Sequence, residues 1–142
     1  MPRVLGIDFG MRRIGVALSD VMGITACPFM LIERESMEKD LDQLEPVIRE
    51  KEVTLIVVGL PLNMDGTDGK LMVEVNSFVR KLQERFKIEV KLVDERLTTL
   101  QAERVLTEEA DVSRGKRKGL RDKVAAALIL QSYLDSTKGF GG

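Results

Sequence analysis

The chain has no histidine, no tryptophan and only one cysteine, Cys27, among its 142 residues. Without histidine no imidazole can act as a general base. A single cysteine cannot form an internal disulfide and in practice excludes a cysteine-based zinc site. Any chemistry must therefore come from carboxylates, lysines, hydroxyl groups or a bound metal ion. One tyrosine and five phenylalanines also leave few aromatic platforms on which nucleic-acid bases could stack.

Long apolar runs are missing too. No segment approaches the roughly 20 apolar residues that a transmembrane helix needs, and the N-terminal residues lack the layout of a signal peptide. Apolar residues make up 44% and charged residues 32% of the chain, a balance typical of soluble globular proteins. We therefore expect a cytoplasmic protein with one domain over residues 1–138 and a flexible tail over residues 139–142.

The first part of the chain is rich in β-branched and apolar residues interrupted by glycine. This pattern predicts three strands, at about residues 3–9, 13–20 and 24–32. Because the separators are short, these strands should form an antiparallel meander. Ser36 is then a plausible N-cap, followed by Met37, Leu41, Leu44 and Ile48 at helical spacing.

Strands and helices alternate in the rest of the chain. The almost wholly apolar run at 53–59 predicts a central parallel strand. Its successors are expected to be an extended loop at 59–70, a helix with its apolar stripe over 71–86, a strand at 88–94, a helix starting near Thr98, a basic loop, and a last helix at 120–135. This order predicts an α/β fold, with a mixed sheet made of the antiparallel meander plus parallel strands and flanked by helices.

Three acidic residues are candidates for a site at one edge of this sheet. Asp8 interrupts an apolar strand, where an ionised and unpartnered carboxylate would cost several kcal/mol. Glu95 follows a parallel strand, and Asp122 lies one turn before the apolar part of the last helix. Each could alone be structural, as a turn acid or as a helix-start acid. Together they would suit hard cations, and we expect two Mg²⁺ or Mn²⁺ ions.

Two such ions roughly 4 Å apart can generate a hydroxide nucleophile and stabilise the leaving oxygen in phosphodiester cleavage. A basic stretch adjoins Asp122, with six basic residues among the ten from Arg114 to Lys123. It could be a solvated loop, but beside Asp122 it would also serve to neutralise phosphates. The sequence thus favours a metal-dependent nuclease.

Four ordered motifs strengthen this prediction. They are Gly6-Ile7-Asp8-Phe9-Gly10 with its continuation to Ala17, Gly59-Leu60-Pro61 with Met64-Asp65-Gly66-Thr67, Asp94-Glu95-Arg96-Leu97-Thr98-Thr99 and Asp122-Lys123-Val124-Ala125-Ala126. Together these motifs resemble the YqgF (RuvX) family. These are Holliday-junction-resolvase-like nucleases, now mostly described as processing ribosomal RNA precursors.

The resemblance implies a ribonuclease-H-like fold, a cytoplasmic location and a role in maturing the 5′ end of the 16S ribosomal RNA precursor, with ribosomal precursor particles as partners. It implies an acidic site at Asp8, Glu95 and Asp122. The nucleic-acid-facing positions that it implies are Arg12, Arg13, Asn63, Lys70, Arg114, Lys116, Arg117, Lys118 and Arg121.

Other functions stay open at this point. The substrate could be a structured DNA such as a four-way junction, which would favour a homodimer over a monomer. A non-catalytic RNA-binding or ribosome-assembly factor could keep the same fold. The glycine-rich turn after Asp8 also resembles the phosphate-binding turn of actin-like ATPases, although those proteins need two lobes and this chain has room for one.

Overall fold

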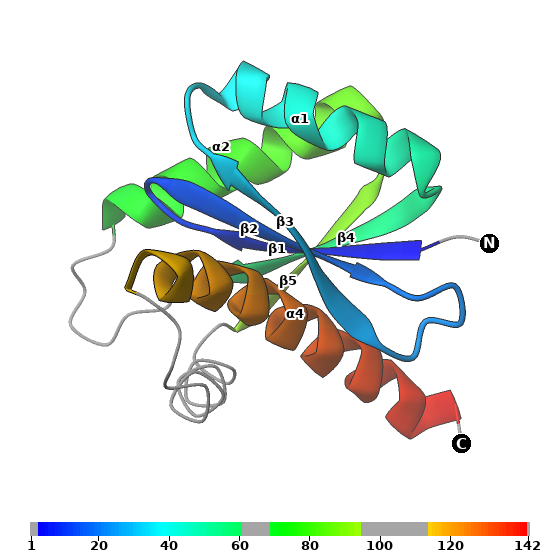
Figure 1. Ribbon diagram of the computed structural model, residues 1–142. Helices are drawn as coiled ribbons and strands as arrows, with labels where there is room; N and C mark the ends of the chain where they lie inside the picture. Colours follow the sequence, from blue (N-terminus) through cyan, green and yellow to red (C-terminus); the bar gives the residue numbers. More distant parts are fainter. Residues whose placement is uncertain (1–2, 61–68, 95–113, 142) are drawn as a thin grey trace.

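The computed structural model describes residues 3–60, 69–94 and 114–141 (Figure 1). Its strands are β1 (Arg3–Phe9), β2 (Arg13–Ser19), β3 (Ala26–Glu33), β4 (Val53–Leu60) and β5 (Glu89–Asp94). Its helices are α1 (Met37–Glu50), α2 (Gly69–Phe86) and α4 (Arg114–Gly141). Within the described residues no helix is long and apolar enough to cross a membrane.

The five strands form one mixed sheet in the order β3-β2-β1-β4-β5. β1, β2 and β3 are successive antiparallel neighbours, and β4 and β5 run parallel to β1. β4 pairs on both sides, which agrees with its almost wholly apolar sequence. The predicted meander, the central parallel strand and the fold class are thus confirmed.

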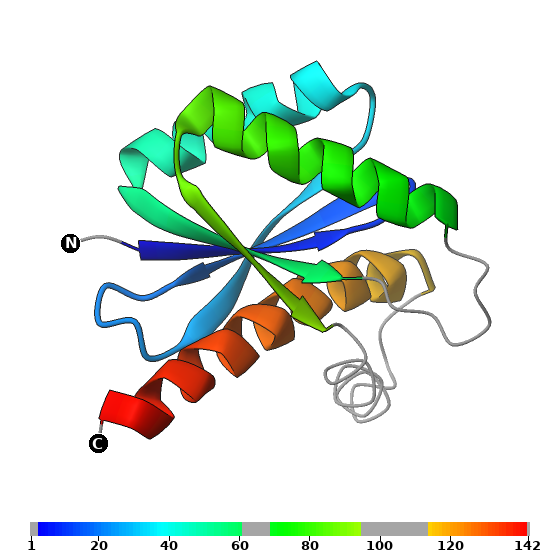
Figure 2. The same cartoon turned by 180° about the vertical axis from the view of Figure 1, so that it is seen from behind.

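Helices cover both faces of the sheet. Figures 1 and 2 show α1 and α2 on one face and the long helix α4 on the other. The face under α1 and α2 buries alternate residues of β1, namely Leu5, Ile7 and Phe9. The opposite face packs against α4 through a second cluster that includes Ala17, Val57, Ala126, Ile129 and Leu130. Because side chains alternate along a strand, Asp8 faces α4.

α1 begins where the sequence predicts. The Ser36 side chain accepts a hydrogen bond from the backbone N–H of Lys39 at 3.2 Å, which satisfies one of the free donors in the first turn. Leu41, Leu44 and Ile48 are buried as predicted. Asp40 is buried with them, which the sequence analysis did not predict.

Several boundaries differ from the predictions. The stretch from Arg114 to residue 119, predicted as a loop, belongs to α4. Helix formation is cooperative, so the part of α4 that packs on the sheet can continue into turns that contain Gly115 and Gly119. α4 also continues through residues 139–141 of the predicted tail, whose flexibility stays a prediction. The third strand starts at Ala26 instead of residue 24, since the Asp20 carboxylate accepts hydrogen bonds from the N–H groups of Ile24 and Thr25 in a turn.

The predicted loop over 59–70 is shorter at both ends. Its first two residues complete β4 and its last two begin α2. Residues 61–68 of this loop and the predicted helix near Thr98 lie outside the described residues.

Candidate active site

Asp8 occupies the second-to-last position of β1 and is half-buried. It lies opposite Gly15 of β2, and its neighbour Ile7 lies opposite Val58 of β4. Asp8 is therefore at the carboxyl end of a strand that has a parallel neighbour, where the ligands of such sheets collect.

α4 runs over β1 in the opposite direction. Its middle lies above Gly6, because a Cβ atom at Gly6 would come within 3.0 Å of the Ala126 carbonyl oxygen. Farther along, the Gln131 side chain accepts a hydrogen bond from Ala26 N–H and donates one to the Ile24 carbonyl. Those residues precede and begin β3, at the end of the sheet where β1 starts. The part of α4 before Ala126 therefore extends toward the carboxyl end of β1 (Figures 1 and 2).

Asp122 lies in this part of α4, one helical turn before Ala126. A turn of helix rises about 5.4 Å, and the two residues from Gly6 to Asp8 span about 6.6 Å of strand. A Cβ atom at Gly6 would meet both Ala126 and Leu130, so the backbone at Asp122 lies one to two turns beyond Gly6 in the direction of Asp8. Glu95 lies outside the described residues, just after β5 ends at Asp94 beside Leu60 of β4.

The structure therefore brings the backbone of Asp122 to the same end of the sheet as Asp8, and the convergence of all three carboxylates stays a prediction. Among the residues whose side chains are described, no group of three or more His, Cys, Asp or Glu residues could hold a metal ion. Of the three predicted acids, only Asp8 belongs to that set.

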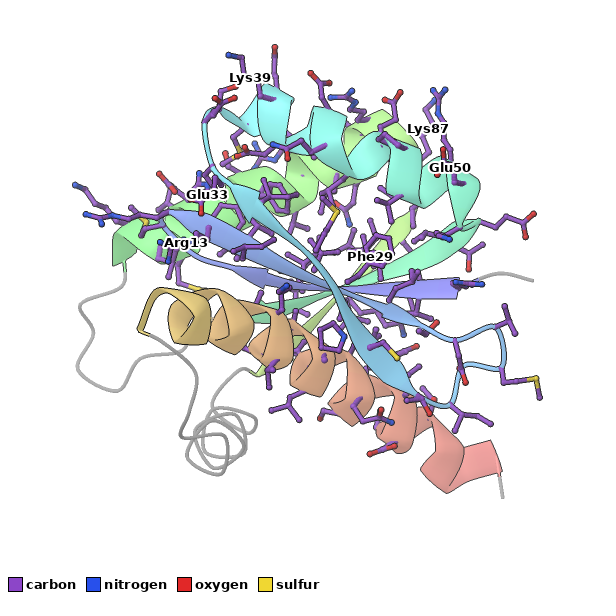
Figure 3. All side chains as sticks on the ribbon, in the orientation of Figure 1. Arg13, Phe29, Glu33, Lys39, Glu50 and Lys87 are labelled. Atoms are coloured by element: carbon purple, nitrogen blue, oxygen red, sulfur yellow. The ribbon has the colours of Figure 1, made fainter. Side chains whose placement is uncertain are left out.

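The predicted nucleic-acid-binding residues fall into separate groups. Arg12 is exposed in the turn between β1 and β2, and Lys70 is exposed in the first turn of α2. Arg13 starts β2, and its Nε donates to Glu33 Oε1 at 3.0 Å. Figure 3 shows this pair at the end of the molecule opposite Lys87 and Glu50. Asn63 lies outside the described residues.

The remaining basic candidates share one element. They occupy the first turns of α4, the helix that carries Asp122: Arg114, Lys116, Arg117, Lys118 and Arg121. Successive residues of a helix rise by about 1.5 Å along its axis. These basic residues therefore follow one another along a helix and not along the loop that the sequence predicted.

Sequence reasoning missed an ion-pair network beside the turn that follows Asp8. Arg34 is 13% exposed and lies near the fully buried Asp40 of α1 and near Glu74 of α2, with nitrogen-to-oxygen distances of 3.6 and 2.9 Å. A signal was present, because Asp40 falls in the apolar stripe of α1 between Met37 and Leu44. A carboxylate in such a stripe needs a cation as partner.

A family model described as "RuvX: Holliday junction resolvase" matches residues 2–136 of the chain. The chain belongs to the RuvX family. A relative from Endomicrobium trichonymphae is 52% identical over 135 residues, covering 95% of this chain and 96% of the relative. A relative from Thermoanaerobacter pseudethanolicus is 52% identical over 136 residues, covering 96% and 98%. Both are named as proposed pre-16S rRNA nucleases.

Solved structures of resolvases share the fold of this RuvX-family chain. T. thermophilus RuvC in complex with a Holliday junction substrate has a TM-score of 0.65 at 15% identity, covering 99% of this chain and 98% of that one. Fowlpox virus resolvase with Holliday junction DNA has a TM-score of 0.55 at 10% identity, covering 95% and 98%. At these identities the likeness concerns the fold alone, and it confirms the predicted ribonuclease-H-like architecture.

Proposed function

We propose that this protein is a metal-dependent nuclease that hydrolyses RNA phosphodiester bonds in the 16S ribosomal RNA precursor, with Asp8, Glu95 and Asp122 as its acidic site. Membership of the RuvX family and relatives named for pre-16S rRNA support the reaction and the substrate. The observation that carries the site is the course of α4, which takes Asp122 along the sheet face where Asp8 lies.

The donor set fits a hard divalent cation. The chain has no histidine, and its single cysteine is exposed on β3 opposite Leu18, near the end of β2 away from Asp8. The site therefore offers carboxylate oxygens, which Mg²⁺ and Mn²⁺ prefer. Bound divalent ions would supply activation of water and stabilisation of the leaving oxygen in phosphodiester hydrolysis.

The protein's own residues have two tasks in this proposal. The three carboxylates hold the cations, and their mutual repulsion would be relieved by the positive charge between them. Arg12, Lys70 and the basic first turns of α4 hold the phosphate backbone of the substrate. Such contacts position a strand without selecting its sequence, so selection of the cleavage site must come from other features.

A cleavage assay on the full-length protein tests the proposal. The substrates are a 16S precursor RNA with its 5′ extension, an unrelated single-stranded RNA and a four-way DNA junction, each with Mg²⁺ or Mn²⁺. The variants are Asp8→Asn, Glu95→Gln and Asp122→Asn. Asp135→Asn is the matched control, because Asp135 is exposed on α4 more than three turns beyond Asp122. Among the described contacts its carboxylate accepts only a surface hydrogen bond from Gln131.

We expect wild type and Asp135→Asn to cleave the precursor RNA and the three site variants to lose cleavage while staying folded. Equal cleavage by wild type and the site variants would contradict the acidic site. Faster cleavage of the four-way junction than of the precursor RNA would indicate that the substrate is DNA and not RNA. Binding of precursor RNA without cleavage, unchanged in Asp8→Asn, would favour a ribosome-assembly factor over a nuclease.

A further inference from the structure

Arg34, the first residue after β3, holds the chain segment that directly follows Asp8. Its guanidinium carbon lies 4.4 Å from the centre of the Phe9 ring. Its Nη1 donates to the carbonyl oxygens of Gly10 and Met11 at 3.0 and 3.1 Å. The three residues after Asp8 thus all contact one side chain.

The guanidinium is itself held by residues of α1 and α2, which cover one face of the sheet. Glu74 of α2 accepts from Nη1 at 2.9 Å. Asp40 of α1 places Oδ2 3.6 Å from Nε, while its Oδ1 accepts from the Glu35 N–H at 3.1 Å. Nη1 has two hydrogens for three acceptors, so at least one hydrogen is shared. Arg34 therefore ties two helices to the β1–β2 turn.

Burial makes this arrangement selective for arginine. The Asp40 side chain is 1% exposed, and a carboxylate so buried needs a cation beside it. A lysine could supply that charge. Only the planar guanidinium can also stack on Phe9 while it donates to the two turn carbonyls.

The turn itself is tight. Gly10 N–H donates to the Arg13 carbonyl at 2.9 Å, and Arg34 N–H donates to the Arg12 carbonyl at 2.9 Å. A Cβ atom at Gly10 would come within 2.8 Å of the Arg13 carbonyl oxygen. The backbone of Arg34 thus joins its side chain in fixing the turn.

We propose that Arg34 is a positioning residue of the Asp8 site: by holding Phe9, Gly10 and Met11 it fixes the end of β1 and hence the Asp8 carboxylate. This inference rests on the proposed nuclease function. A group that holds reacting partners must be placed within about 0.5 Å, and it depends on the residues that support it. Among the described contacts Arg34 reaches Phe9, Gly10 and Met11 but not the Asp8 carboxylate, so it would act through the backbone after Asp8.

Arg85 provides a matched control for the loss of an arginine ion pair. Hydrogen bonds to Asp42 and Glu45 raise the pKa of Arg85 above its ordinary value. Its guanidinium carbon lies 5.4 Å from the centre of the Phe86 ring. It therefore links α1 to α2 as Arg34 does, but from the last turn of α2, whereas Glu74 lies near the start of that helix.

The test compares Arg34→Lys, Arg34→Met and Arg85→Met with wild type in two measurements. The first is steady-state cleavage of precursor RNA, giving kcat and KM. The second is hydrogen exchange of the peptide that contains Gly10 and Arg13, in protein without added metal. Arg34→Lys keeps a positive charge beside Asp40, so this variant should fold even if Arg34→Met does not.

We expect Arg34→Lys to stay folded and to lower kcat about tenfold or more while KM changes less than about threefold, the pattern of a lost supporting contact. Hydrogen exchange of the turn should rise in both Arg34 variants and stay at the wild-type rate in Arg85→Met. A wild-type kcat in Arg34→Lys would overturn the proposal, and so would a wild-type rate of exchange in both Arg34 variants.

The exchange measurement separates this inference from the proposed function. Should the wild-type protein cleave nothing, the nuclease proposal fails, and so does a positioning role in catalysis. Faster exchange in Arg34→Lys would then identify a purely structural clamp. Should wild type cleave and Arg34→Lys cleave equally well, only the positioning role fails.

Discussion

A Cβ atom on Gly6 of β1 would stand 2.6 Å from the Cβ of Leu130 in α4. Glycine therefore lets the helix approach the strand more closely than any other residue would allow. Asp8 lies two residues farther along the same face of β1, and Asp122 lies two turns before Leu130 on the same helix. This one contact thus sets how near the two segments of the candidate site can come.

Replacing Gly6 by alanine should destabilise the protein by about 1–3 kcal/mol, because the added methyl group meets Cβ and backbone atoms that cannot swing away. Chemical denaturation measures the change in the free energy of unfolding. We also expect cleavage to fall at temperatures where the variant is folded, since α4 must shift away from β1.

Gly69→Ala is the control for this substitution. Gly69 begins α2, and a Cβ atom there would have no neighbour within 4 Å. Its stability should stay at the wild-type value or rise slightly, since alanine favours a helix over glycine. A loss of stability that is the same in both variants would mean that the contact with Leu130 does not limit the approach of α4.

Local patterns were sufficient to predict most of the fold. The meander follows from β-branched runs separated by short turns, and β4 follows from an apolar run too short for a helix. Ser36 was predictable as a cap because capping depends on residues within one turn. These features need no knowledge of distant contacts.

Tertiary contacts were harder to foresee. The pairing of Arg34 with Asp40 and Glu74 joins a strand end to two helices, and no local pattern selects Arg34 as the partner. The predicted start of the last helix at residue 120 was wrong, because the basic stretch before it belongs to α4. For the site, the sequence was sufficient to predict that Asp8 lies at the end of a strand. It could not predict that the Asp8 side chain faces α4, because this depends on which helix packs on that face of the sheet.

Lys87, just after α2, adopts a left-handed backbone conformation, with φ at +54°. Its N–H donates to the Gln83 carbonyl at 2.9 Å, a contact typical of a helix end. A residue with a Cβ atom pays about 1–2 kcal/mol in this conformation. Lys87→Gly should therefore stabilise the protein by about 1 kcal/mol, measured by chemical denaturation.

Lys81→Gly provides the opposite case in the same helix. Lys81 lies inside α2, where glycine costs about 1 kcal/mol relative to alanine through its greater backbone freedom in the unfolded chain. We expect this variant to lose stability. If Lys87→Gly lost as much as Lys81→Gly, the left-handed conformation at Lys87 would not be a source of strain.

Arg12 and Arg13 are neighbours in sequence but should differ in their contribution to RNA binding. Arg12 is exposed in the turn after β1, whereas Arg13 donates to Glu33 and must give up that contact to reach a phosphate. Each phosphate contact with a single strand contributes about 0.7 to the slope of log affinity against log salt. Arg12→Ala should therefore weaken binding of single-stranded RNA and lower this slope by about 0.7, and Arg13→Ala should change it less.

Fluorescence anisotropy over a series of salt concentrations measures these slopes, with Asp8→Asn as the background so that the RNA stays intact. Arg49→Ala is the control, because Arg49 is 76% exposed on α1 and pairs only with Glu45 among the described residues, at 3.3 Å. Its slope should equal that of the background protein. Equal slopes for Arg12→Ala and Arg49→Ala would exclude the β1–β2 turn from the RNA-binding surface and leave the basic turns of α4 as its main candidate.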